Sequence, residues 1–110
     1  MANSQQTLND LQNLTTLYRE GHRSPIIDRA VEKIVAFERD RARQEMDELN
    51  AKLQRCEQQH HMNSEEFYRR FRSGELGDDL EWVEWSIFYE MRATVRQRLT
   101  LLEPRASYET

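Results

Sequence analysis

Residues 25–60 read PIIDRAVEKIVAFERDRARQEMDELNAKLQRCEQQH and contain no glycine, and no proline after Pro25. Proline fits the first position of a helix, because its missing N–H has no partner there, and Ser24 can act as the N-cap. Apolar residues recur at steps of three and four, which predicts one long helix with a single apolar stripe. The stripe consists of Ile27, Val31, Ile34, Val35, Ala42, Met46, Leu49, Leu53, Cys56 and His60.

Such a helix would be about 54 Å long, and one chain of 110 residues cannot cover that length by itself. We therefore expect an antiparallel partner helix and a likeness to a coiled-coil hairpin. Two copies are expected to complete a dimeric helical bundle by isologous packing. The predicted fold class is all-α, with the long helix packed antiparallel on two shorter helices.

Capping signals place the shorter helices. Asn63 is a candidate N-cap with Glu66 reaching back, and Gly74 is the predicted C′ residue, which gives a helix over 64–72. Asp78 is expected to cap a final helix over 79–102, which ends before Pro104. Thr7 is the expected cap of an N-terminal helix that ends at Gly21. We expect three parts: a polar tail with a short helix (1–23), a helical hairpin domain (24–103) and a tail (104–110).

On a helical wheel, the last helix is apolar on two sides. One broad face is the expected core stripe, and Trp82, Trp85 and Tyr89 lie nearly opposite. Two interpretations of this Trp face stay open: the short helix folds back over it, or it meets another polypeptide. The core stripe consists of Leu80, Val83, Ile87, Met91, Val95, Leu99 and Leu102.

Six acidic residues and no Lys or Arg lie between Ser73 and Met91. Capping and the helix dipole explain some of these acids, and the excess could steer a basic partner. We therefore hypothesise one recognition surface made by the SGELGDD turn and the Trp face. Its predicted partner-binding residues are Glu75, Asp78, Asp79, Trp82, Trp85 and Tyr89.

Composition excludes several classes. The net charge of −4, with basic residues interleaved among acids, argues against direct nucleic-acid binding. The single cysteine cannot form an intrachain disulfide. Because neither a signal peptide nor a run of roughly 20 apolar residues is visible, we expect no membrane association and a cytoplasmic location.

Catalytic and metal-binding patterns are weak. The pairs Glu45/Glu48 and Glu81/Glu84 could hold Mg²⁺ as in some all-α nucleotide pyrophosphohydrolases, but such pairs are frequent in Glu-rich helices. Cys56 and His60 are four residues apart, whereas a zinc site needs three or four ligands. We expect no catalytic residue, no metal and no cofactor, and hence no enzyme.

Residues 62–91, MNSEEFYRRFRSGELGDDLEWVEWSIFYEM, resemble the C-terminal signature of small all-helical antitoxin-like proteins of bacteria and archaea, the TumA-type antitoxins among them. The similarity covers roughly residues 17–102, although Val83 stands where many members have an aromatic residue. It implies a non-catalytic protein that binds and neutralises a small toxin. The alternatives are a structural or adaptor coiled-coil protein and a Mg²⁺-dependent nucleotide pyrophosphohydrolase.

Overall fold

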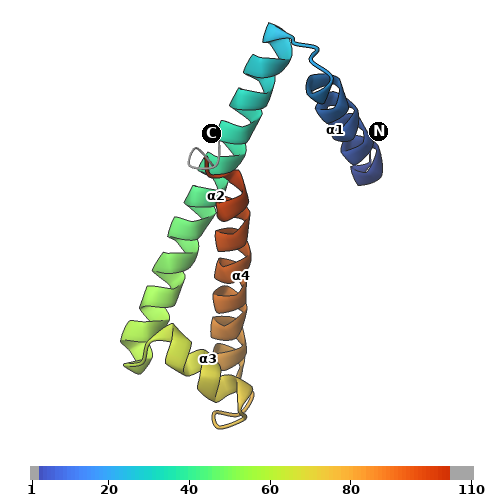
Figure 1. Ribbon diagram of the computed structural model, residues 1–110. Helices are drawn as coiled ribbons and strands as arrows, with labels where there is room; N and C mark the ends of the chain where they lie inside the picture. Colours follow the sequence, from blue (N-terminus) through green and yellow to red (C-terminus); the bar gives the residue numbers. More distant parts are fainter. Residues whose placement is uncertain (1–2, 105–110) are drawn as a thin grey trace. The chain divides into compact units, whose positions relative to one another are not determined.

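The structure is a computed structural model that describes residues 3–104, and helices account for most of this range (Figure 1). Four helices follow in order: α1 (Ser4–Arg19), α2 (Pro25–His60), α3 (Ser64–Arg72) and α4 (Leu80–Leu102). The all-α prediction is therefore confirmed. Residues 1–2, and residues 105–110 of the predicted C-terminal tail, lie outside the described residues.

The chain divides into two compact units, Met1–Ile34 and Val35–Thr110. We call their described parts the N-terminal unit (residues 3–34) and the C-terminal unit (residues 35–104). The N-terminal unit holds α1 and the first turns of α2. The C-terminal unit holds the rest of α2 together with α3 and α4, so one continuous helix contributes to both units.

The sequence located most helix ends correctly. The Ser24 hydroxyl accepts from the Ile27 N–H at 3.3 Å at the start of α2. The Asn63 side chain accepts from the Glu66 N–H at 2.8 Å at the start of α3. After α3, Gly74 has φ +86°, and the N–H groups of Gly74 and Glu75 donate back to Phe71 and Arg70, as in a Schellman motif.

Two predicted caps are wrong. Helix α1 begins at Ser4 and is capped by Asn3, whose side chain accepts from the Gln6 N–H at 2.8 Å, so Thr7 lies inside the helix. Helix α4 has Asp79 rather than Asp78 as its N-cap residue, with no capping bond from the side chain. Neighbouring polar residues offer the same cap chemistry, so the path of the preceding chain decides between them.

In the C-terminal unit, α4 runs alongside α2, and α3 joins their lower ends (Figure 1). Ala42, Leu49 and Val95 are buried where the two long helices meet. We call this contact the seam; Met46, Phe88 and Leu99 pack around it. The predicted packing of the long helix on the last helix is confirmed.

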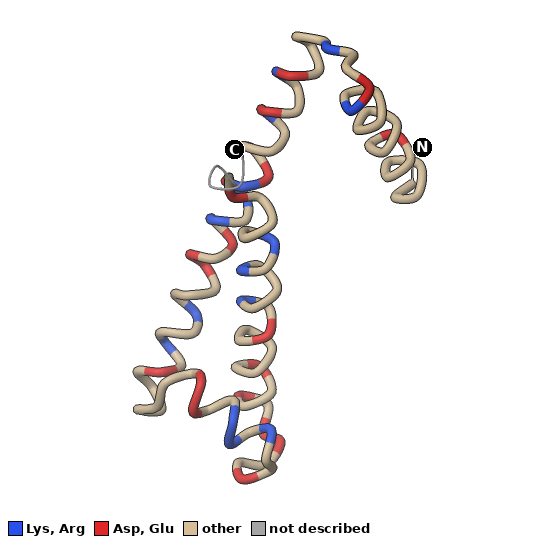
Figure 2. The backbone as a smooth tube through the Cα atoms, viewed as in Figure 1, with Lys and Arg blue, Asp and Glu red and all other residues tan. Residues whose placement is uncertain are grey.

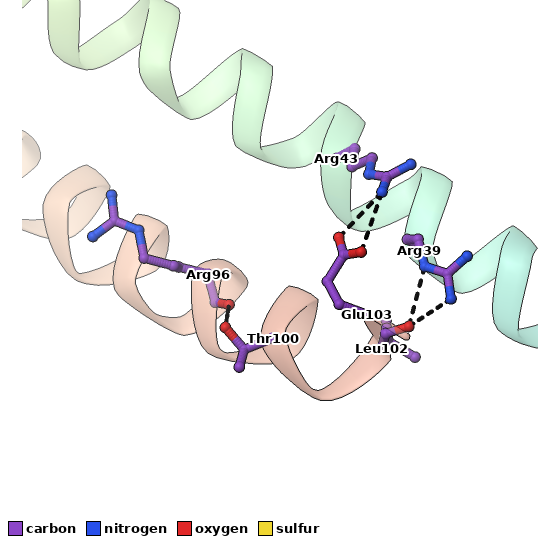
Figure 3. A network of polar contacts seen from close by, with 6 residues as sticks. All are labelled: Arg39, Arg43, Arg96, Thr100, Leu102 and Glu103. Atoms are coloured by element: carbon purple, nitrogen blue, oxygen red, sulfur yellow. Dashed lines mark hydrogen bonds and ion pairs between the residues drawn. The ribbon is translucent and has the colours of Figure 1, made fainter. Parts of the chain in front are cut away.

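The upper end of the seam is closed by polar contacts (Figure 3). The Arg39 guanidinium donates two hydrogen bonds to the carbonyl oxygen of Leu102, from Nε at 3.1 Å and from Nη2 at 2.6 Å. Arg43 forms an ion pair with Glu103 at 3.1 Å. The last turn of α4 has carbonyl groups without helical partners, and Arg39 satisfies one of them.

The predicted core stripe of α4 is wrong in its first half, where Leu80, Ile87 and Met91 are 80%, 46% and 47% exposed, whereas its last members, Val95, Leu99 and Leu102, do lie on the buried face. That stripe steps mostly by four residues, and each such step turns about 40° around a helix, so the stripe winds away from a straight partner. The buried face instead alternates steps of three and four. It consists of Trp85, Phe88, Arg92, Val95, Leu99 and Leu102.

The N-terminal unit is held differently. The Tyr18 hydroxyl lies 2.7 Å from Asp28 Oδ1 and 2.9 Å from the carbonyl oxygen of Ser24, and it accepts from the Ser24 N–H at 3.2 Å. Partial desolvation, followed by the hydrogen bond to Asp28, raises the pKa of this hydroxyl. No described residue of this unit is buried.

None of the helices in residues 3–104 combines the length and the apolar character that a membrane crossing requires.

Candidate functional site

Three helices meet at one end of the C-terminal unit around Leu53 of α2, Phe67 of α3 and Trp85 of α4. We call these three residues the junction. Phe67 and Trp85 have no exposed surface, and their rings stack with centroids 3.9 Å apart and planes 3° from parallel. The short helix therefore folds back over the Trp face, which is the first of the two interpretations that the sequence left open.

A buried polar group fixes the junction. The Ser64 hydroxyl is fully buried, accepts from the Trp85 indole N–H at 3.0 Å and donates to Glu57 Oε2 at 2.8 Å. The same Glu57 oxygen accepts from the Ser64 backbone N–H at 2.9 Å. The indole N–H of Trp85 and the hydroxyl of Ser64 thus both have partners, which avoids the penalty of an unpaired buried donor at the junction.

Sequence analysis missed the role of Glu57, because it expected Glu66 to reach back to the cap of α3. Glu66 instead pairs with Arg70 at 2.9 Å and with Arg69 at 3.5 Å. A signal was present, since Glu57 directly follows Cys56 in the apolar stripe of α2 and so flanks the buried face. Nothing in the sequence shows, however, that α3 returns to that flank.

Trp82 and His60 lie at the edge of the junction. The His60 ring lies between the two indoles, with centroids 4.7 Å from Trp82 and 5.4 Å from Trp85. Its Nε2 is 3.7 Å from Glu81 Oε2. Trp82 remains half-buried, so one side of its indole is in contact with the core and part is open to solvent.

Tyr89 is also half-buried and belongs to a separate polar–aromatic cluster. Its ring stacks on Tyr68 with centroids 4.6 Å apart, and Arg92 lies over it at 5.5 Å. The Tyr68 hydroxyl donates to Glu90 at 2.6 Å, and this hydrogen bond raises the pKa of Tyr68. Tyr89 therefore contacts α3 within the unit, as Trp85 does.

Four of the six acidic residues lie on the α3–α4 loop and the first turn of α4, and the other two follow on later turns of α4 (Figure 2). Glu75, Asp78 and Asp79 are exposed. Within residues 3–104, none of these three carboxylates forms an ion pair or a side-chain hydrogen bond. Their charges are therefore not used in capping, although the positive end of the α4 dipole stabilises those of Asp78 and Asp79.

The loop also exposes a large apolar side chain. Leu80 directly follows Asp79 and is 80% exposed, whereas Leu76 is half-buried and packs against the junction. We call Glu75, Asp78, Asp79, Leu80 and the open edge of Trp82 the acidic loop surface. The sequence analysis assigned Leu80 to the core and therefore did not include it among the candidate partner-binding residues.

The six predicted partner-binding residues therefore do not form a single surface. Trp85 is inside the junction and Tyr89 packs on α3, whereas Glu75, Asp78, Asp79 and Trp82 are near the loop. The interpretation of Trp85 as a surface anchor is wrong, because Phe67 and Ser64 cover it completely. Partner binding by the remaining residues stays a prediction.

A shallow groove of about 350 Å³ lies on another side of α4. Ile87, Met91 and Val95 supply its apolar lining, and the ion pair between Arg98 and Glu45, at 2.7 Å, crosses from α4 to α2 beside it. Sequence analysis assigned Ile87 and Met91 to the core, so it did not consider this groove.

The carboxylate and thiol candidates do not converge. Glu45 is paired with Arg98, and Glu81 lies near His60. In the part of the chain that the structure describes, no group of three or more His, Cys, Asp or Glu side chains could hold a metal ion. Partial burial, followed by the nearby Glu84, raises the pKa of the Cys56 thiol, which disfavours the reactive thiolate.

Comparisons with protein families, with curated proteins and with solved structures find no match for this chain.

Proposed function

We propose that this protein is a non-catalytic, dimeric protein-binding module whose acidic loop surface takes a basic protein partner, in the manner of an antitoxin that neutralises a small toxin. The observation that carries the proposal is the set of three exposed carboxylates without partners beside Leu80 and Trp82. Each feature has a separate use in binding. The carboxylates accelerate encounter with a cationic surface, and the apolar and aromatic groups hold the partner once it is bound.

The distribution of charge supports a basic partner. Residues 35–104 contain 15 acidic and 11 basic side chains, whereas residues 3–34 contain four of each. The whole net charge of −4 is thus accounted for by the C-terminal unit. This excess disfavours contact with nucleic-acid phosphates and favours a cationic protein.

The loop is held in one place by its anchors. Gly77 has φ +81°, a conformation that glycine adopts without strain, and Leu76 packs on the junction just before it. A loop held at both ends presents its carboxylates with little ordering cost on binding, which favours affinity.

The test first asks whether a short reading frame lies beside the gene, then uses its product as the partner and compares a pair of charge-reversal variants. Asp78→Lys/Asp79→Lys alters the acidic loop surface. Asp47→Lys/Glu48→Lys makes the same change of net charge at two exposed positions of α2. At low salt we expect the loop variant to slow association by about tenfold or more, with the difference shrinking as salt rises. The α2 variant should associate at nearly the wild-type rate.

In co-expression, wild type and the α2 variant should protect cells from the toxic product, and the loop variant should not. Equal association rates for the two variants would overturn the assignment of the acidic loop surface. A neighbouring product that is harmless alone, or that does not bind, would overturn the antitoxin proposal and favour an adaptor coiled coil built on the α2–α4 seam.

A further inference from the structure

The N-terminal unit has an apolar surface that no described residue covers. Helix α1 has 16 residues and not one of them is buried. Isolated helices of this length are marginal in water, and proteins stabilise them mainly by packing an apolar face. The large apolar side chains exposed in this unit are Leu8, Leu11, Leu17, Ile26, Val31 and Ile34.

Part of this surface forms a groove of about 540 Å³ between α1 and the first turns of α2. Leu11, Leu14 and Tyr18 line it from α1, and Ile27 and Val31 line it from α2. The hydrogen bonds of Tyr18 to Asp28 and Ser24 join the two helical segments at their connected ends. The unit is thus a helical hairpin that is tied at one end and lacks a core.

We propose that the N-terminal units of two copies of this chain pack groove to groove and form a four-helix bundle; this assignment rests on the dimeric state proposed above. An isologous interface places the same surface on both sides, so it must be compatible with itself. The N-terminal unit meets this condition, since its four acidic and four basic residues balance. Two copies of the C-terminal unit, each with a net charge of −4, would have to overcome like-charge repulsion at such an interface.

The chemistry of the groove also fits a permanent partner. Four of its eight lining residues are Leu, Ile or Val, as in a helix-bundle core, and Thr15, Tyr18, Arg19 and Asp28 make up the rest. Obligate homodimer interfaces likewise have an apolar centre with a polar rim. Four amphipathic helices can enclose one apolar core and form a stable bundle. Two helices alone leave part of their apolar faces exposed to water.

The test compares two matched variants of the full-length chain. Leu11→Arg places a charge in the groove of the N-terminal unit, where Leu11 is 54% exposed. Met91→Arg makes the same kind of change on α4, where Met91 is 47% exposed. Light scattering at concentrations up to about 100 μM measures the mass. We expect dimers for wild type and Met91→Arg, and a loss of affinity of at least tenfold for Leu11→Arg, since a buried unpaired charge is costly.

Both tryptophans lie in the C-terminal unit, so their emission reports the fold of that unit alone. Unchanged emission in a monomeric Leu11→Arg variant supports the proposal. If the Trp emission of Leu11→Arg shifts, the substitution has disturbed the fold, and the milder Leu11→Gln is used instead. The proposal then requires the Leu11→Gln dimer to be weaker than the Met91→Arg dimer.

A monomeric wild type overturns both the dimer and its interface. A dimer that Leu11→Arg leaves intact overturns this interface only, and points to the α4 groove if Met91→Arg dissociates it. Neither outcome affects the test of the acidic loop surface, which measures association with the toxic partner.

Discussion

In the C-terminal unit three helices enclose Leu53, Phe67 and Trp85, whereas in the N-terminal unit two helical segments meet without burying a single described side chain. Both units are built from amphipathic helices with leucine-rich faces. The difference is the third element: α3 covers the end of the α2–α4 hairpin and supplies Phe67, while the N-terminal hairpin has no such cover. Apolar periodicity alone therefore shows that a helix needs a partner, but not whether its own chain provides one.

Among the tests of this comparison, the substitution Trp85→Ala has the largest expected effect. Because Trp85 is fully buried and stacked on Phe67, its truncation should lower the free energy of unfolding by about 3–5 kcal/mol. Urea unfolding followed by far-UV circular dichroism measures this change. Phe37→Ala is the matched control, because Phe37 is an exposed aromatic residue of the same unit, and should change stability by less than about 0.5 kcal/mol.

If Trp85 were instead a surface residue that anchors a partner, Trp85→Ala would leave the stability intact and abolish binding. A loss in Trp85→Ala no larger than that in Phe37→Ala would show that the junction is not the core of the C-terminal unit.

A second, smaller effect is expected from Ser64→Ala. The change removes the hydroxyl between the Trp85 indole and Glu57, and leaves a buried N–H without its acceptor. The expected loss is about 1–3 kcal/mol in the same unfolding experiment. Ser73→Ala removes an exposed hydroxyl that donates to the Arg70 carbonyl oxygen, and should be nearly neutral. Equal losses in the two variants would mean that the buried hydroxyl has no special role.

The smallest expected effect comes from removing a helix N-cap in each unit, Asn63 in the C-terminal unit and Asn3 in the N-terminal unit. Asn63 and Asn3 each accept a hydrogen bond of 2.8 Å from the third residue that follows. Asn63→Ala should lower the stability measured by Trp emission by about 1 kcal/mol, because α3 is part of the junction. Asn3→Ala should leave that transition unchanged and reduce only the helical signal. A matching shift of the Trp transition in both variants would show that the cap of α1 also stabilises the C-terminal unit, and would contradict this prediction.

Local interactions explain what the sequence predicted well. The bounds of α2 and α3, the caps at Ser24 and Asn63 and the turn at Gly74 depend on residues within a few positions of one another. The packing of α2 on α4 was predictable from the apolar stripe of α2, which alternates steps of three and four and needs a partner helix, although the face that α4 presents to it was not. The exposure of the loop acids could also be predicted, because Glu75, Asp78 and Asp79 are charged side chains in a turn that contains two glycines.

The helices of this protein could be predicted from local sequence, because hydrogen bonds within a helix and at its caps join near neighbours in the chain. The buried side of α4 depends on tertiary contacts, since that helix has apolar residues on two sides and the choice between them is made by the side chains that α2 and α3 offer. The stacking of Trp85 on Phe67 and the acceptor at Ser64 favour the Trp side, and they leave Leu80, Ile87 and Met91 exposed. The role of Glu57 also depends on tertiary contacts, because its hydrogen-bond partner Ser64 belongs to α3, and no local sequence pattern shows that α3 packs back against α2.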